Sequence, residues 1–288
     1  MNSIGLRSYP SAINWQVYKK LHWLARMQQA LEFLEECEVL SKCLSKIQEG
    51  DWDRVTAFKN WTLNDVLVHL HFWNEMADLS VFDQERFNQR IGAAVVGIKS
   101  GGLRSIENET IAVRGFELFD IWYKFSVDMS QRWRDLDPKL RVPWAGPDMS
   151  VRSSITARQM ETWAHGQEVF DALGITRSES DRIKNIVILG INTFGWSHQV
   201  QGLTVPDNMP QLQLTSPSGE TWTFGDKSAG HISGNAVEFA QVVTQTRNVL
   251  DTDLLIEGEV ASKWMATAQC FAGPPETPPQ PGKRCKAV

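Results

Sequence analysis

The spacing of apolar residues changes once along this 288-residue chain, near residue 200. Before that point apolar residues recur every three or four positions, the spacing of helices that bury one face. After it, residues 211–215 and 220–224 alternate polar and apolar side chains around the turn Ser216-Pro-Ser-Gly219, which indicates a β-hairpin. The two periods predict a mainly α protein, in which a helical bundle precedes a small α+β domain.

Start and stop signals bound the expected helices. Thr62-Leu-Asn-Asp65 has capping-box spacing, Gly174 stands at a helix C-terminus, and Asp137-Pro138 ends the helix before it. Residues 93–104 are rich in glycine and are expected to form a loop. The expected helices cover about 26–48, 62–77 with an extension to 90 left open, 111–133, 153–174, 181–200, 236–248 and 261–271.

These signals divide the chain into four parts. They are an N-terminal extension over 1–25, the helical bundle over 26–202, the α+β domain over 203–272 and a Pro-rich flexible tail over 273–288. The extension lacks the apolar core of a signal peptide, and no run of about 18 apolar residues predicts a membrane span.

Charge and cysteine usage narrow the class of partner. The net charge of −5 provides no basic field for nucleic acid or an anionic membrane. The four cysteines lack the CxxC spacing of redox or metal motifs, as is usual for reduced intracellular thiols. We expect a cytoplasmic protein that binds a small-molecule substrate, with no nucleic-acid or membrane partner. The oligomeric state is left open.

One helix carries a pair of candidate metal ligands. Glu161 and His165 lie four positions apart, so both side chains lie on one helix face and can bind one cation. On the helix that begins at Thr62, His69 and His71 flank the apolar stripe on opposite sides, and periodicity does not choose between them. Asp65 precedes His69 by one turn and is expected to accept the ring N–H of His69 while also capping the helix.

Two imidazoles and one carboxylate would leave one position open on a tetrahedral ion, which is typical of catalytic zinc. Zinc is favoured. Nickel, iron and manganese are alternatives, because ligand type alone does not select the metal. The 12 tryptophans suit an aromatic-lined pocket. His71, Trp73 and His198 are candidates to line it.

Two segments resemble a known family. The sequence from Trp61 to Leu70, WTLNDVLVHL, is similar to a segment of the DinB/YfiT-like superfamily of metalloenzymes, in its mycothiol-dependent maleylpyruvate isomerase branch. The sequence from Met160 to Glu168, METWAHGQE, is similar to a second segment of that branch. The segments keep their order across about residues 27–272. The resemblance implies a DinB-like four-helix bundle with a metal at one end, followed by a small sterol-carrier-protein-like α+β domain.

The resemblance also implies roles for individual residues. It selects His69 over His71 as the third ligand, beside Glu161 and His165. In the isomerase branch an arginine of the C-terminal domain faces the metal, and the segment that ends at Arg247 resembles the helix that carries it, so Arg247 is the catalytic candidate.

Four positions depart from the family pattern. Asn60, Asn74 and Glu168 replace a glycine, an acidic residue and an aspartate, and His198 replaces an apolar residue.

Three functions fit these features. In the favoured one, a metal-dependent enzyme uses a low-molecular-weight thiol to attack a conjugated carbonyl, giving isomerisation or S-transfer, while Arg247 holds a carboxylate or enolate. In the second, the metal acts alone as a Lewis acid in an isomerase, cyclase or hydrolase of secondary metabolism. In the third, the protein is a non-catalytic metal- or ligand-binding protein.

Overall fold

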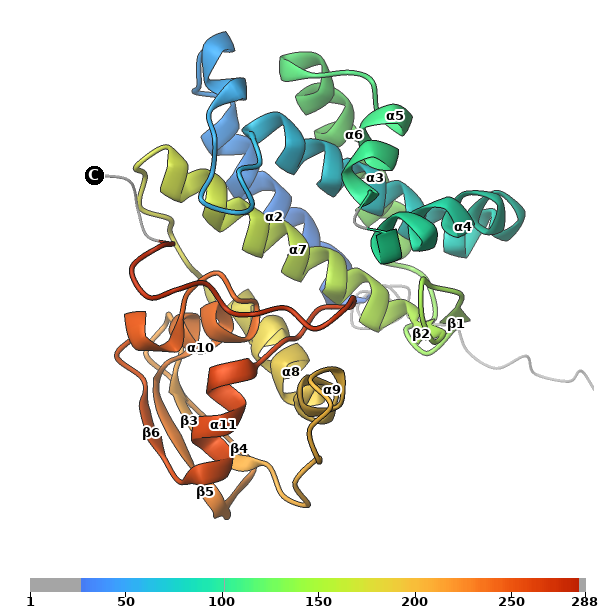
Figure 1. Cartoon of the computed structure of the whole chain (residues 1–288). Coiled ribbons are helices and arrows are strands. Elements are labelled where there is room, and N and C mark those ends of the chain that lie inside the picture. The colour runs from blue at the N-terminus through green and yellow to red at the C-terminus, as the bar shows by residue number, and fades with distance from the viewer. Residues whose placement is uncertain (1–26, 101, 285–288) are drawn as a thin grey trace, which may run out of the picture.

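Four long helices form a bundle that lies beside a smaller domain built on a sheet (Figure 1). The computed structural model describes residues 27–100 and 102–284, so the predicted extension over 1–25 lies outside the described residues. The bundle helices are α2 (Gln28–Leu44), α3 (Leu63–Phe82), α6 (Gly115–Trp133) and α7 (Val151–Ala172). Both α2 and α3 pack against α6 and α7, which closes the four-helix bundle that the resemblance implied.

The predicted glycine-rich loop over 93–104 is wrong. Helix α4 (Gln84–Ser100) covers most of it, and α5 (Leu103–Thr110) begins at its end. A Cβ added at Gly97 would lie 3.1 Å from the Leu103 Cα and would also collide with the Ile106 side chain, so this glycine allows α4 and α5 to pack closely. Helix α3 ends at Phe82, because the non-helical backbone of Asp83 separates it from α4.

Shorter elements connect the bundle to the C-terminal domain. The predicted helix over 181–200 is interrupted at Thr193, which separates α8 (Lys184–Asn192) from α9 (Phe194–Val200). The remaining short elements are η1 (Glu49–Asp53), η2 (Asp181–Ile183), η3 (Val249–Asp251) and the antiparallel pair β1 (Arg141–Val142) and β2 (Met149–Ser150).

The C-terminal domain contains the predicted hairpin, β3 (Pro210–Thr215) and β4 (Thr221–Phe224), which is confirmed with its antiparallel register. Two strands that periodicity did not reveal, β5 (Asp226–Asn235) and β6 (Leu255–Glu257), complete a sheet of order β4-β3-β5-β6. Helices α10 (Ala236–Val243) and α11 (Glu259–Thr267) pack on the sheet (Figure 1). Leu212 and Leu214 of β3 are fully buried while Gln213 between them is exposed, as the alternation predicted.

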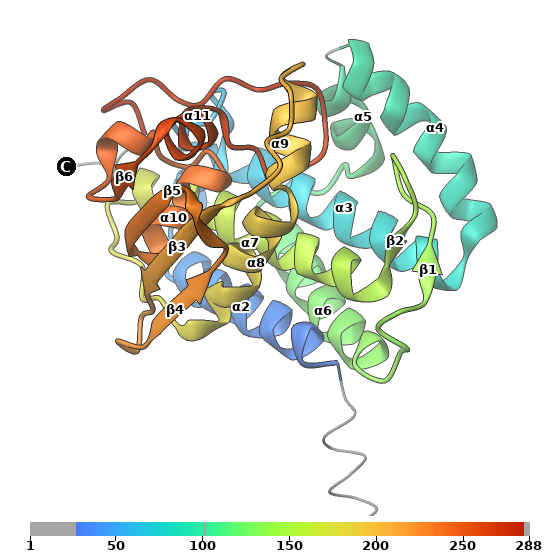
Figure 2. The same cartoon turned by 90° about the horizontal axis from the view of Figure 1, so that it is seen from below.

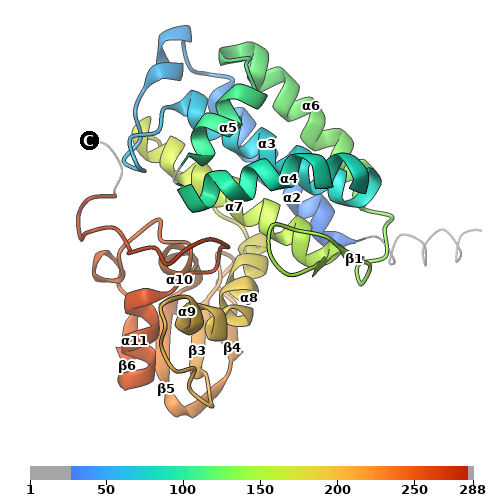
Figure 3. The same cartoon turned by 45° about the vertical axis from the view of Figure 1, so that its right-hand side comes forward.

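Helix α7 contributes to both hydrophobic cores of the described chain. Val151, Ile155 and Phe170 belong to the core of the bundle. Met160 and Trp163 belong to the core of the C-terminal domain. Helix α8 packs against both α7 and α10 and so joins the two parts (Figures 2 and 3).

The described part of the C-terminal segment is packed against the protein, which differs from the predicted flexible tail. After α11 it runs back between the C-terminal domain and α7 (Figure 1). Lys59 pairs with Glu276 at 2.8 Å, and the Asn248 amide donates to the Pro279 carbonyl at 2.7 Å. Composition alone did not reveal these partners, which come from distant parts of the chain. None of the described helices is long and apolar enough to cross a membrane.

We expect Glu36→Ala to lower the free energy of unfolding by about 3–5 kcal/mol, because it would remove the buried carboxylate that pairs with two arginines. Glu36 is buried on α2 and pairs with Arg177 and, at 2.7 Å, with Arg182, both beyond the end of α7. Urea unfolding measures the change, and Glu35→Ala at an exposed position of the same helix is the control. Equal losses in both variants would contradict a role for the buried ion pairs.

Candidate metal centre

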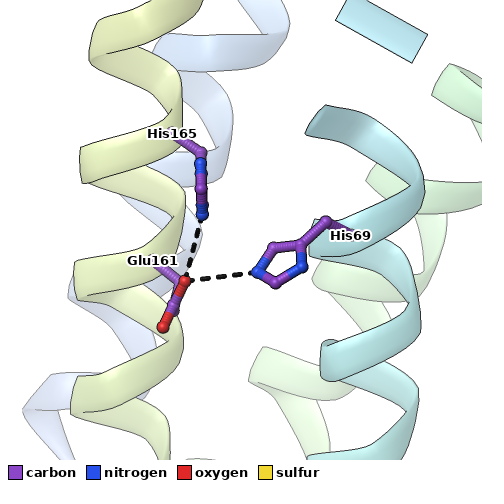
Figure 4. Close-up of side chains that lie close together, drawn as sticks. All are labelled: His69, Glu161 and His165. Atoms are coloured by element: carbon purple, nitrogen blue, oxygen red, sulfur yellow. Dashed lines mark hydrogen bonds and ion pairs between the residues drawn. The ribbon is translucent and has the colours of Figure 1, made fainter. Parts of the chain in front are cut away.

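The three predicted ligands lie together between α3 and α7 (Figure 4). The Oε2 atom of Glu161 is 3.4 Å from Nε2 of His69 and 3.3 Å from Nε2 of His165. Ligand atoms about 2.0 Å from a tetrahedral zinc ion are about 3.3 Å apart. All three candidate ligand atoms lie within 4.8 Å of one another, so small side-chain rotations would bring them onto one ion.

Helix geometry and packing account for this arrangement. Glu161 and His165 are one turn apart on α7, and His69 faces them from α3, which packs directly on α7 (Figure 4). Both imidazoles are largely buried, with His69 9% and His165 8% exposed. Because the two helices are part of the bundle core, the backbone positions of the ligands are fixed by packing rather than by a loop.

Two aromatic residues of the segment before α3 enclose the histidines. The Trp61 ring stacks on His165 at 5.4 Å and an interplanar angle of 12°, and lies 5.2 Å from the His69 ring. Phe58 meets His165 edge-on at 5.0 Å. This enclosure keeps water from one side of the site, which strengthens electrostatic interactions within it.

Glu107 is the functional candidate that sequence reasoning missed. Its Oε1 atom lies 2.8 Å from Nδ1 of His69 and also accepts a 2.8 Å hydrogen bond from the Trp73 indole. A carboxylate on Nδ1 leaves Nε2 free to bind a metal and fixes the orientation of the ring. Sequence patterns did not indicate Glu107, because no helix was expected at α5, which carries this 2%-exposed side chain.

Asp65 is not the partner of His69, which corrects the prediction. Its carboxylate accepts hydrogen bonds from the Thr62 backbone N–H at 2.8 Å and from the Thr62 hydroxyl at 2.7 Å, and it pairs with Arg104. The capping box is confirmed. At the third helical position the carboxylate turns back to the unpaired amides of the helix N-terminus, while Glu107 occupies the Nδ1 side of His69.

The other predicted pocket residues have different surroundings. Trp73 lies at the edge of the site, where its indole N–H donates a hydrogen bond to Glu107. His71 is buried on the opposite side of α3, where its ring lies 5.5 Å from Phe125 of α6. His198 is buried in α9, where its Nδ1 atom lies 2.9 Å from the Phe194 carbonyl one turn earlier. These contacts support packing roles for His71 and His198 rather than the predicted place in a pocket.

Arg247 forms an ion pair between the two domains. Its two terminal nitrogens lie 2.7 and 2.8 Å from the two carboxylate oxygens of Asp171, near the end of α7. Both ends of its planar fork are therefore occupied by a residue of the protein. The catalytic role of Arg247 stays a prediction.

The charges of His165 and Glu161 suit metal binding, whereas His69 would have to lose a proton first. Burial lowers the pKa of His165, which favours the neutral imidazole that binds metals. Burial raises the pKa of Glu161, but hydrogen bonds with His165 and His69 outweigh this effect and hold it well below its usual range. Burial also lowers the pKa of His69, yet Glu107 outweighs burial and raises it to about 9. An incoming cation would therefore displace a proton from His69.

Comparisons with known proteins agree with the resemblance seen in the sequence. Residues 33–170 match the family described as mycothiol maleylpyruvate isomerase N-terminal domain. Two uncharacterized proteins of Mycobacterium tuberculosis, one from each of two strains, are 33% identical over 241 residues, which cover 83% of this chain and 93% of each relative.

Two crystal structures, of the mycothiol-dependent maleylpyruvate isomerase and of a mutant of it, share 14% and 15% identity with this chain. Their TM-scores are 0.48 and 0.49, and the match covers 75% of this chain and 87% of each structure. The chain belongs to the family of proteins with a mycothiol maleylpyruvate isomerase N-terminal domain, as the family match and the mycobacterial relatives show.

We expect Glu107→Gln to weaken zinc binding by roughly 10- to 100-fold, because the neutral amide is a weaker acceptor for the His69 ring. Asp65→Asn is the matched control. It should leave zinc affinity unchanged and lower the free energy of unfolding by about 1 kcal/mol, through the weakened cap. Competition with a zinc chelator measures the affinities. The reverse pattern would restore Asp65 as the orienting residue.

The buried Glu168 should make the free energy of unfolding depend on pH. Burial raises its pKa from the ordinary value of 4.5 to about 7. Between these values the folded protein binds more protons than the unfolded chain, so stability falls as pH rises through this window. In Glu168→Gln the side chain cannot ionise. The free energy of unfolding of this variant, relative to that of the wild type, should therefore rise by about 2–3 kcal/mol between pH 4.5 and 8. Thermal and urea unfolding across this range test it, and a constant difference would contradict the argument.

Proposed function

We propose that this protein is a metal-dependent enzyme that uses a small thiol to isomerise an electrophilic conjugated carbonyl compound, or to join the thiol to it. The observation that carries the proposal is the spacing of His69, Glu161 and His165, whose ligand atoms suit one divalent ion. Three protein ligands leave a coordination position open, as in catalytic zinc sites. The matched domain family is named after an isomerase that depends on the thiol mycothiol.

A divalent ion in this site would favour the deprotonated form of a bound thiol. The residues around it would hold the reactants in a restricted, partly dry space. Trp61 and Phe58 cover the histidines, and Glu107 holds His69 through Nδ1. Glu161, His69 and His165 would serve as ligands and not as proton carriers, since each would use its free electron pair on the ion.

The proposed reaction balances without a further reactant. The thiolate sulfur forms a bond to the carbon β to the carbonyl, and the π electrons move to the carbonyl oxygen as an enolate. The former double bond is then single and rotates. Return of the electrons breaks the sulfur–carbon bond, which restores the double bond in the other geometry and releases the thiolate. If the α-carbon takes up a proton instead, the product is the thioether.

The test begins with the metal. Protein purified without added metal should contain about one divalent ion per chain by elemental analysis, and His165→Ala should lose it. His71→Gln is the matched control on α3 and should keep the ion, because His71 faces Phe125. If only His71→Gln lost the metal, His71 would replace His69 as the expected ligand on α3.

Turnover of a maleyl-type conjugated acid, with and without cysteine or mycothiol, then tests the reaction. We expect isomerisation only when metal and thiol are both present. Turnover that needs metal but no thiol would support a Lewis-acid isomerase instead. A fully metal-loaded protein without turnover of such acids would favour a binding function.

A further inference from the structure

A buried arginine beside the candidate metal centre has donors without acceptors. Arg158 lies on α7 almost one turn before Glu161 and is 4% exposed. Its Nη2 atom is 3.6 Å from the Oε1 atom of Glu161, which is too long for a hydrogen bond. Its Nε and Nη1 atoms are buried and make no hydrogen bond within the described residues. The cation is therefore enclosed in protein with most of its hydrogen-bonding capacity unused.

Such an arrangement is costly unless a ligand completes it. A buried donor without a partner costs the free energy of its lost hydration, and the cost is larger for a charged group. The other arginine of comparable burial, Arg177, illustrates the usual solution. It pairs with Glu36 and donates to the Trp163 carbonyl at 2.6 Å, which leaves only its Nε without a hydrogen bond, 3.4 Å from Glu179. The nearest carboxylate to Arg158, by contrast, is Glu161, whose other oxygen faces the two histidines.

The surroundings of Arg158 favour an anionic ligand. The guanidinium lies 5.8 Å from the ring centre of Trp144, in the segment that joins β1 to β2, and Trp144 is 5.5 Å from Trp73. With a divalent ion in place, three positive charges from the ion and Arg158 would face two negative charges from Glu161 and Glu107. The site would then be positive until an anion bound, and the planar guanidinium suits a carboxylate.

We propose that Arg158 binds a carboxylate of the substrate beside the metal, and that this contact makes the enzyme selective for conjugated acids over neutral carbonyl compounds. The inference rests on the proposed function and adds a substrate class to it. It also assigns the substrate contact to a different arginine from Arg247, whose fork is already occupied by Asp171.

The experiment compares an acid with its neutral counterpart. Zinc-loaded wild type, Arg158→Met and Arg158→Lys are titrated calorimetrically with maleate and with maleamide, which lacks the charge. We expect Arg158→Met to weaken maleate binding by roughly 10- to 100-fold and to leave maleamide binding unchanged. Arg158→Lys keeps the positive charge but not the planar guanidinium. Its affinity for maleate should lie between those of the wild type and Arg158→Met. Arg152→Met, at an exposed position of α7, is the matched control and should bind both probes as the wild type does.

The zinc content and the binding of cysteine distinguish failure of the Arg158 inference from failure of the proposed thiol function. Addition of cysteine to the cobalt-loaded protein should produce cobalt–sulfur absorption in the wild type and in Arg158→Met. Absence of this absorption in the wild type would refute the thiol function, whatever maleate does. Unchanged maleate affinity in Arg158→Met would overturn the role of Arg158. Zinc loss from a folded Arg158→Met would also overturn it, since Arg158 would then position Glu161. Should this variant not fold, maleate binding by Arg158→Lys as tight as that of the wild type would overturn the role.

Discussion

Helix α7 is packed on two sides at once, and the rest of the structure depends on this constraint. One side contributes Val151, Ile155 and Phe170 to the core of the bundle, and another contributes Met160 and Trp163 to the core of the C-terminal domain. A helix with two buried sides has little freedom to shift or rotate, because interior packing is dense. Glu161 and His165 are carried by this helix, so the two domains together fix the position of two candidate ligands.

The same burial explains why charged groups gather along α7. Arg158, Glu161, Glu168 and Asp171 all lie on this helix, and all but Glu161 are at least nine-tenths buried. Buried charges persist only where partners compensate for lost hydration. Asp171 has Arg247 from the C-terminal domain, and Glu168 has Arg284 at 3.5 Å from the C-terminal segment. Glu161 has the two histidines. Of these four side chains, only that of Arg158 makes no hydrogen bond within the described residues.

Helix α5 has few apolar residues, yet it supplies a side chain that contacts a candidate ligand. This short helix places Glu107 against Nδ1 of His69. Gly97 permits the close approach of α5 to α4, and Arg104 of α5 pairs with Asp65 at the start of α3. The predicted partner of His69 was wrong because a capping carboxylate has nearer donors in its own helix N-terminus. The partner in the structure comes from a segment in which no helix was expected.

The sequence alone determined the mainly α class, the hairpin from β3 to β4, the capping box at Thr62 and the pairing of Glu161 with His165. These features depend on contacts within a few residues, which spacing reports directly. Spacing could not choose between His69 and His71, and it missed Glu107, β5 and β6. It also did not reveal the partners of Arg247 or of the C-terminal segment. The family resemblance in the sequence selected His69. Only the tertiary structure revealed the others, because each depends on a group more than 30 residues away or on a strand that gains its stability from its neighbours in the sheet.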